Sequence, residues 1–271
     1  MKTLVSILAS ATLVLATASF AQTAEVVDLP TRPGVRQRML VVQPEHPTAV
    51  LLLMTGGNGQ VGIYDNGSLR ADGNFLVRSR TLFVQRGFAV VLLDPPSDHD
   101  TAPFLAGTFR ESPEHAADIG AAVAWSRSKW SLPVWLVGTS RGTQSVASAG
   151  ILLTGASAPD GLVLTSTILG ASRVGQSRVR PVQEMSLEKL RMPVLVTHHE
   201  QDQCQVTPPA LVPALMEKLT PATSRLLTYT GGRSTGNVCE AFAYHGYNGI
   251  EDRVVADIAA FVTAPPKAGP P

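Results

Sequence analysis

One serine in this sequence lies in a local pattern that can make it a nucleophile. Residues 138–142 read Gly-Thr-Ser-Arg-Gly, a G-x-S-x-G pattern with Ser140 at its centre. The apolar, β-branched residues 133–137 before it predict a buried strand, and the Ala- and Ser-rich residues 143–153 after it predict a helix. A sharp turn between a strand and a helix forces strained dihedrals on the residue at its tip. Side chains at positions 138 and 142 would collide with the helix or the strand, so glycine is needed at both. We therefore predict that the turn pushes the Ser140 hydroxyl into a cleft, where the start of the helix offers backbone N–H groups to an anion.

The same pattern occurs a second time, so the pattern alone does not identify a nucleophile. Residues 232–236 also read G-x-S-x-G, with Ser234 at the centre, and they follow the strand-like residues 226–229. No helical pattern comes after them, and we predict a glycine-rich loop there. For Ser140 the alternative is a tight strand–helix turn that only needs a small residue at its tip. Catalytic partners elsewhere in the sequence decide between a nucleophile and a purely structural turn at Ser140.

A serine nucleophile needs a general base, and the base needs an acid that orients it. Asp202 follows the apolar run 194–197, which predicts a strand. His245 lies in the loop that precedes the last predicted helix, 250–262. Glu200 is an alternative acid, because it lies in the same loop as Asp202. The nucleophile, the acid and the base thus each follow a predicted strand.

The order Ser140, Asp202, His245 resembles that of the α/β-hydrolase fold serine hydrolases. The resemblance covers nearly the whole predicted mature chain, from about Val35 to Val262. It implies that Ser140 attacks a carbonyl carbon, that His245 takes its proton and that Asp202 holds the imidazole. The segment His-His-Glu-Gln-Asp that ends at Asp202 is similar to the family's H-G-x-x-D segment, with His199 in place of the glycine.

Attack on a carbonyl creates an oxyanion, which needs two backbone N–H donors. The resemblance implies that one is the N–H of Arg141, the residue after the nucleophile. The other is expected from residues 55–59, Thr-Gly-Gly-Asn-Gly, which follow the predicted strand 49–54. Gly57 is the first choice and Asn58 the second. The alternative for these residues is a flexible glycine turn.

The two cysteines, Cys204 and Cys239, predict a disulfide, because the protein is expected to be exported and the count is even. Two buried thiols are the alternative. A bridge closes a loop of roughly 36 residues and contributes about 3–4 kcal/mol to stability in the chain-entropy model. Cys204 is two residues after Asp202 and Cys239 is six before His245, so a bridge ties the acid loop to the base loop.

The N-terminus predicts a signal peptide over residues 1–21. It has a positive start, a short apolar run over 4–15 and a small-x-small cleavage site that ends at Ala21. The apolar run is short for a membrane span, and no cysteine near the cleavage site indicates a lipid anchor. We predict a secreted or periplasmic protein with one domain over 22–263 and a Pro-rich, disordered tail over 264–271.

Charge and composition argue against several other classes. The sequence has 22 Lys and Arg against 21 Asp and Glu, which favours neither a nucleic acid nor an anionic membrane as a partner. One group of arginines is expected to be a solvated loop surface, with a patch for an acidic substrate as the alternative: Arg173, Arg178, Arg180 and Arg191. Metal-ligating residue types crowd residues 198–204, but without the helical spacing of a zinc protease, so we predict no metal and no cofactor.

Alternating strand-like and helix-like runs predict an α/β fold with a mostly parallel sheet and helices on both faces. The predicted strands are 36–42, 49–54, 88–93, 133–137, 162–167, 194–197 and 225–229. The predicted helices are 76–85, 113–129, 143–153, 210–219 and 250–262. Residues 170–192 are too few for a large cap, so we expect a small or absent lid and a fairly open site. Candidate wall residues are Tyr64, Phe104, Trp135 and Tyr247.

The predicted function is hydrolysis of a carboxylic ester through a Ser140 acyl-enzyme, with a small-molecule ester or a peptide as the substrate. A serine peptidase or amidase on the same triad is the first alternative. A non-catalytic binding protein on the hydrolase scaffold is the second, and the presence of all three triad residues argues against it.

Overall fold

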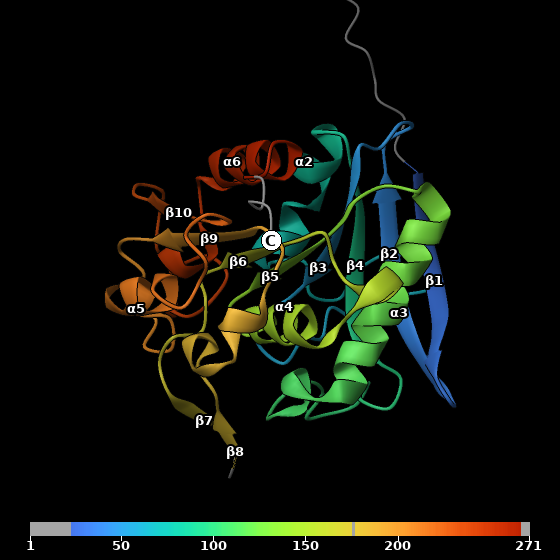
Figure 1. Cartoon of the computed structure of the whole chain (residues 1–271), viewed down its shortest axis with the longest axis horizontal. Coiled ribbons are helices and arrows are strands. Elements are labelled where there is room, and N and C mark those ends of the chain that lie inside the picture. The colour runs from blue at the N-terminus through green and yellow to red at the C-terminus, as the bar shows by residue number, and fades with distance from the viewer. Residues whose placement is uncertain (1–22, 175–176, 267–271) are drawn as a thin grey trace, which may run out of the picture.

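The computed structural model describes residues 23–174 and 177–266 and contains one large sheet (Figure 1). The predicted signal peptide and residues 267–271 of the predicted tail lie outside the described residues. Eight strands form the sheet in the order β1-β2-β4-β3-β5-β6-β9-β10. Their bounds are Thr23–Arg32 (β1), Val35–Gln43 (β2), Ala49–Met54 (β3), Phe88–Pro96 (β4), Val134–Thr139 (β5), Gly161–Thr165 (β6), Val194–His199 (β9) and Ser224–Tyr229 (β10).

The sheet is mostly parallel, as the sequence predicts. From β4 to β10 neighbouring strands are parallel, whereas β1 pairs antiparallel with β2, and β2 with β4. Every residue of the central strands β3 and β5 is buried, which explains their continuous Val and Leu runs. Because parallel strands end at one edge, the loops that follow β3, β5 and β9 lie together there.

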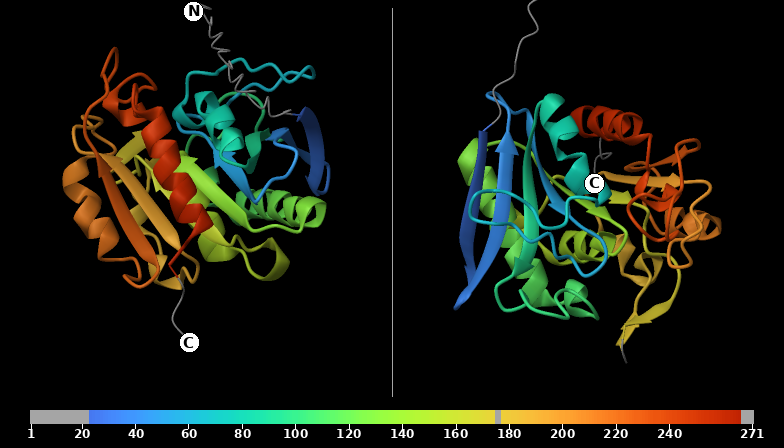
Figure 2. Two further views of the ribbon diagram at one scale, coloured as in Figure 1. Left: turned by 90° about the horizontal axis from the view of Figure 1, so that it is seen from above. Right: turned by 180° about the vertical axis from the view of Figure 1, so that it is seen from behind.

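Helices cover both faces of the sheet (Figure 2). One face packs against α3 (Pro113–Trp130), α4 (Gly142–Leu152) and α5 (Val212–Met216). The other packs against α1 (Phe75–Arg78), α2 (Arg80–Gln85) and α6 (Glu251–Thr263). Among the described residues, no helix is both long and apolar enough to cross a membrane.

Some boundaries differ from the prediction. The edge strand β1 has no buried residue and was not predicted, because it lacks an apolar run. The predicted helix 76–85 is divided at Ser79 into α1 and α2. The predicted helix 210–219 is reduced to α5 and a preceding 3₁₀ turn, since prolines at 208, 209 and 213 lack backbone N–H donors. A hairpin of β7 (Ser172–Val174) and β8 (Ser177–Val179) projects from the body (Figure 1).

Candidate active site

Ser140 occupies a strained turn between β5 and α4. Its φ is 52°, a left-handed conformation that non-glycine residues rarely adopt, and its N–H donates to Thr165 O at 3.0 Å. A Cβ at Gly138 would lie 2.5 Å from Gly142 O, and one at Gly142 would lie 2.1 Å from Met54 O. Both glycines of the pattern are therefore required by close backbone contacts. The second pattern, around Ser234, lies in a loop as predicted.

Asp202 and His245 are joined by a hydrogen bond. Asp202 lies in the turn after β9, and His245 lies in a 3₁₀ turn, Tyr244–Gly246, before α6. The His245 Nδ1–H donates to Asp202 Oδ2 at 2.9 Å, and both side chains are buried. Asp202 also accepts from Cys204 N at 2.9 Å and from Thr207 Oγ1 at 2.8 Å. Three donors thus fix the carboxylate in one orientation, which fixes the imidazole in turn.

Thr207 is a part of this arrangement that the sequence analysis missed. Its Oγ1 lies 2.8 Å from Asp202 Oδ2 and 3.1 Å from His245 Nδ1. A threonine five residues after a candidate acid carries no distinctive pattern. The alternative acid, Glu200, is exposed and accepts from Thr228 Oγ1 at 2.8 Å, so the structure brings Asp202 and not Glu200 to His245.

Tyr247 supports the loop that carries His245 through a set of buried hydrogen bonds. Its hydroxyl donates to Thr197 O at 2.9 Å and accepts from Ser166 N at 3.1 Å, while Ser166 Oγ donates to His245 O at 2.7 Å. Burial raises the pKa of Tyr247 to about 12, so the hydroxyl stays a donor at neutral pH. Tyr247 is therefore a support for the backbone of His245 and not the pocket wall that the sequence analysis predicted.

Ser140 and His245 line one open cavity of about 400 Å³. Its other lining residues come from the loops after β3 and β10, from the end of β5 and from the start of α1: Gly56, Gly57, Ala71, Gly73, Asn74, Phe75, Thr139, Cys239, Glu240, Ala241, Phe242 and Gly246. No hydrogen bond joins the Ser140 and His245 side chains in the part of the chain that the structure describes. Catalytic hydrogen bonds of this kind often tighten only when substrate binds.

Of the predicted oxyanion donors, Gly57 lies at the same cavity, and Arg141 directly follows Ser140, which also lines it. Neither the Gly57 N–H nor the Arg141 N–H has a hydrogen-bond partner among the described residues. The neighbouring Gly56 packs so closely on Ser140 that a Cβ there would lie 2.8 Å from Ser140 Cβ. Asn58 does not line the cavity; its carbonyl accepts from Leu105 N at 2.9 Å. The geometry therefore favours Gly57 over Asn58.

The predicted aromatic walls were wrong. Trp135 is buried in the core against Phe261, and Tyr64 lines no part of this cavity. Phe75 and Phe242 take their place, and Phe242 is 51% exposed. The sequence offered no signal for them, because the loop of Phe242 meets α1 only in the folded chain.

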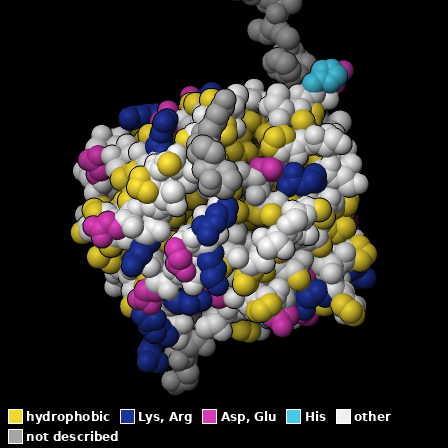
Figure 3. All heavy atoms as spheres, viewed as in Figure 1, with side chains coloured by type: hydrophobic (Ala, Val, Ile, Leu, Met, Phe, Trp, Pro, Cys, Tyr) yellow, Lys and Arg dark blue, Asp and Glu magenta, His cyan; other side chains and the backbone are white. Residues whose placement is uncertain are grey.

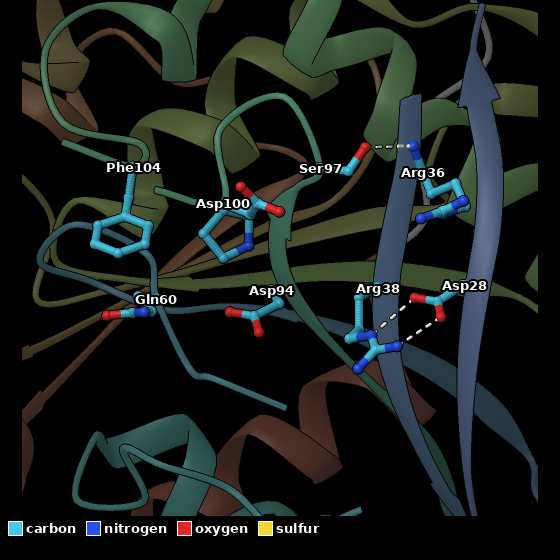
Figure 4. Close-up of a pocket in the computed structure, with 9 residues that line it drawn as sticks. Asp28, Arg36, Arg38, Gln60, Asp94, Ser97, Asp100 and Phe104 are labelled. Carbon is cyan, nitrogen blue, oxygen red and sulfur yellow. Dashed lines mark hydrogen bonds and ion pairs between the residues drawn. The ribbon is translucent and has the colours of Figure 1, made fainter. Parts of the chain in front are cut away.

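Phe104 lies at a second cavity, of about 260 Å³, which shares no residue with the first (Figure 4). Three of its charged residues, Asp28, Arg38 and Asp94, form contacts that hold the fold. Arg38 forms an ion pair with Asp28 at 2.7 Å, and the Asp94 carboxylate accepts from the backbone N–H groups of residues 61–63. The second cavity has no serine–histidine pair, so we place the candidate chemistry at the cavity of Ser140.

Cys204 and Cys239 form the predicted disulfide. It connects the loop that carries Asp202 to the loop that carries His245, and Cys239 also lines the cavity of Ser140. The bridge thus links the acid and base loops directly.

Replacing both cysteines with serine is expected to lower the free energy of unfolding by about 3–4 kcal/mol, because the 35-residue loop is no longer closed in the unfolded chain. Urea unfolding of the variant and of wild type measures the difference, and the rate of ester hydrolysis is expected to fall with it. Unchanged stability and activity, in the variant and in reduced wild type, would contradict the predicted role.

The residues considered as metal ligands or as a basic patch have other contacts. His198 Nε2 donates to Thr207 O and His199 Nε2 to Gly231 O, both at 2.9 Å. Within 23–174 and 177–266, no three His, Cys, Asp or Glu side chains are arranged to share a metal ion. Arg178 pairs with Glu184 at 2.8 Å. Acidic and basic side chains are interspersed on the face seen in Figure 3.

No family model matches the sequence, and no curated protein matches it. Solved structures do match the fold. A cold-adapted esterase from an Arctic intertidal metagenomic library is 15% identical, with 91% of this chain and 96% of that chain covered and a TM-score of 0.57. A dienelactone hydrolase from Anabaena variabilis is 14% identical, with coverages of 89% and 98% and a TM-score of 0.61. Brefeldin A esterase, a bacterial homologue of human hormone-sensitive lipase, is 19% identical, with coverages of 93% and 79% and a TM-score of 0.60. The chain has the α/β-hydrolase fold.

Proposed function

We propose that this protein is a serine hydrolase that cleaves a small carboxylic ester through an acyl-enzyme on Ser140. The observation that carries the proposal is the 2.9 Å bond from His245 Nδ1 to Asp202 Oδ2 at the wall of the cavity that Ser140 lines. The similar folds of a cold-adapted esterase and of brefeldin A esterase favour an ester as the substrate.

In the first half of the reaction, Ser140 Oγ attacks the carbonyl carbon of the ester while His245 Nε2 takes the hydroxyl proton. The carbonyl oxygen becomes an oxyanion, which accepts from the Gly57 and Arg141 N–H groups. The ester C–O bond then breaks, and His245 gives its proton to the leaving alcohol. In the second half, water attacks the acyl-enzyme in the same way, and the carboxylic acid leaves.

Asp202 contributes by holding the imidazole with Nδ1 protonated, so that Nε2 has a free lone pair for the proton of Ser140. The three hydrogen bonds that Asp202 accepts satisfy the oxygens of its buried side chain. We also infer that the protein is exported, because a disulfide between Cys204 and Cys239 is typical of oxidising compartments.

Labelling with a fluorophosphonate probe, followed by mass mapping, tests the proposal. Wild type is expected to carry the label on Ser140, and Ser140→Ala is expected to carry none. Ser234→Ala is the matched control, because it removes the serine of the second G-x-S-x-G pattern, and it should label as wild type does. A folded wild-type protein that takes no label would exclude an activated serine and favour a binding role.

Paired substrates then separate the esterase from the amidase. We expect turnover of p-nitrophenyl acetate and little turnover of the matching p-nitroanilide. A faster reaction with the anilide would replace the esterase proposal with the peptidase or amidase alternative.

A further inference from the structure

Arg110 is a buried cation without an acidic partner. It lies in the 3₁₀ turn Phe109–Glu111 before α3, and only 1% of its surface is exposed. No Asp or Glu among the described residues forms an ion pair with it. Burial, together with the nearby charge of Arg141, lowers the pKa of Arg110 to about 9, so the group stays protonated at neutral pH.

The guanidinium joins two elements of the candidate site. Its Nη2 donates to Thr55 O at 3.1 Å and to Gly57 O at 3.3 Å, and both carbonyls belong to the loop after β3. Its Nη1 donates to Ser145 Oγ at 2.9 Å, and Ser145 lies on α4, four residues after Arg141. One planar group therefore spans the two backbone segments that carry the Gly57 and Arg141 N–H groups.

The rest of the network is neutral. Ser145 Oγ also lies 2.9 Å from Nε2 of the buried His115. Burial, followed by the charge of Arg110, lowers the pKa of His115 to about 3, so its imidazole is uncharged at neutral pH. The Ser145 hydroxyl has a lone pair for Arg110 Nη1 whether it donates to His115 or accepts from it. The network leaves Arg110 Nε without a hydrogen bond among the described residues, and it supplies no negative charge.

Burying a charge that has no ionic partner costs free energy. A neutral side chain that donates to the same two carbonyls would cost less. The same burial weakens the screening of that charge, so it acts strongly on charges that form nearby. In the proposed reaction the charge that forms nearby is the oxyanion, because the loop whose carbonyls accept from the guanidinium also carries the Gly57 N–H group.

We propose that Arg110 is a positioning residue of the oxyanion hole. It holds the carbonyls of Thr55 and Gly57 against α4, so that the Gly57 and Arg141 N–H groups converge, and its charge favours the anionic tetrahedral intermediate. Arg110 does not touch the substrate. The inference rests on the proposed function, because it concerns the same site.

The test compares Arg110→Met and Arg110→Lys in the full protein. Because the N–H donors act mainly in the transition state, Arg110→Met should lower kcat for p-nitrophenyl acetate about ten- to hundred-fold, with KM within about two-fold. The rate of fluorophosphonate labelling should fall in parallel. Arg110→Lys should recover part of both rates, because it keeps the charge but cannot reach both carbonyls.

Arg127→Met is the matched control. Arg127 also donates to two loop carbonyls, Ala156 O at 3.3 Å and Ala158 O at 2.8 Å, but these loops lie away from the cavity. Its kcat should stay within about two-fold of wild type.

Three results would overturn the inference: a folded Arg110→Met with the kcat and labelling rate of wild type, a change in KM alone, or an equal loss in Arg127→Met. If Arg110→Met does not fold, Arg110→Lys decides, since wild-type kcat in that variant would exclude a positioning role. A wild-type protein that takes no label contradicts the proposed function instead, so the two failures are distinguishable.

Discussion

Replacing Asp202 with asparagine is expected to lower kcat for ester hydrolysis by about 10,000-fold, with KM nearly unchanged. The carboxylate accepts from Cys204 N at 2.9 Å, which an amide oxygen can also do, so the side chain keeps its orientation. The amide nitrogen then faces His245 Nδ1 and donates to it. The imidazole must carry its proton on Nε2, where it can no longer accept the proton of Ser140.

Glu200→Gln is the matched control for this prediction, because Glu200 is an exposed carboxylate in the same loop and its partner is Thr228. Its kcat is expected to stay within about two-fold of wild type. Steady-state kinetics with p-nitrophenyl acetate measure both variants, and thermal unfolding verifies that both are folded. A large loss in Glu200→Gln with little loss in Asp202→Asn would move the acid to Glu200.

The fold could be predicted where one local pattern carries the structural signal. The central strands are buried on both faces and read as unbroken Val and Leu runs. The helix from Pro113 begins as predicted, with the Ser112 hydroxyl accepting from His115 N at 3.1 Å. The edge strand β1 could not be predicted in the same way. It gains its order from pairing with β2, which a single stretch of sequence does not contain.

The same distinction between local patterns and distant contacts applies to the candidate site. The turn at Ser140 and the order of the acid and base are properties of the sequence, and the structure brings Asp202 to His245. Arg110 and Thr207 have no local signal, because their roles exist only through contacts with segments distant in sequence or through a hydroxyl that any threonine has. Tyr247 was predicted as a wall because aromatic residues line many sites, yet its hydroxyl is used by Ser166 and Thr197.

Gly142→Ala is expected to lower the free energy of unfolding by about 3 kcal/mol or more, because overpacking against backbone leaves little room to relax. The added Cβ would lie 2.1 Å from Met54 O and 3.0 Å from Thr55 O, so either α4 or the end of β3 must move. Movement at Thr55 also shifts the loop of Gly57. Urea unfolding measures the free energy of unfolding, and steady-state kinetics measure kcat. We expect both quantities to fall together.

Gly155→Ala is the control for this change. Gly155 has a φ of 60° and open space around it, so alanine there meets strain but no collision. Its cost is expected to be about 1–2 kcal/mol, with unchanged kcat. If Gly142→Ala cost no more than Gly155→Ala, the contact with Met54 O would not be what requires glycine after Ser140. A larger cost that brings a fall in kcat would instead mean that one contact, between β3 and the start of α4, sets both the turn of the nucleophile and the position of its oxyanion donors.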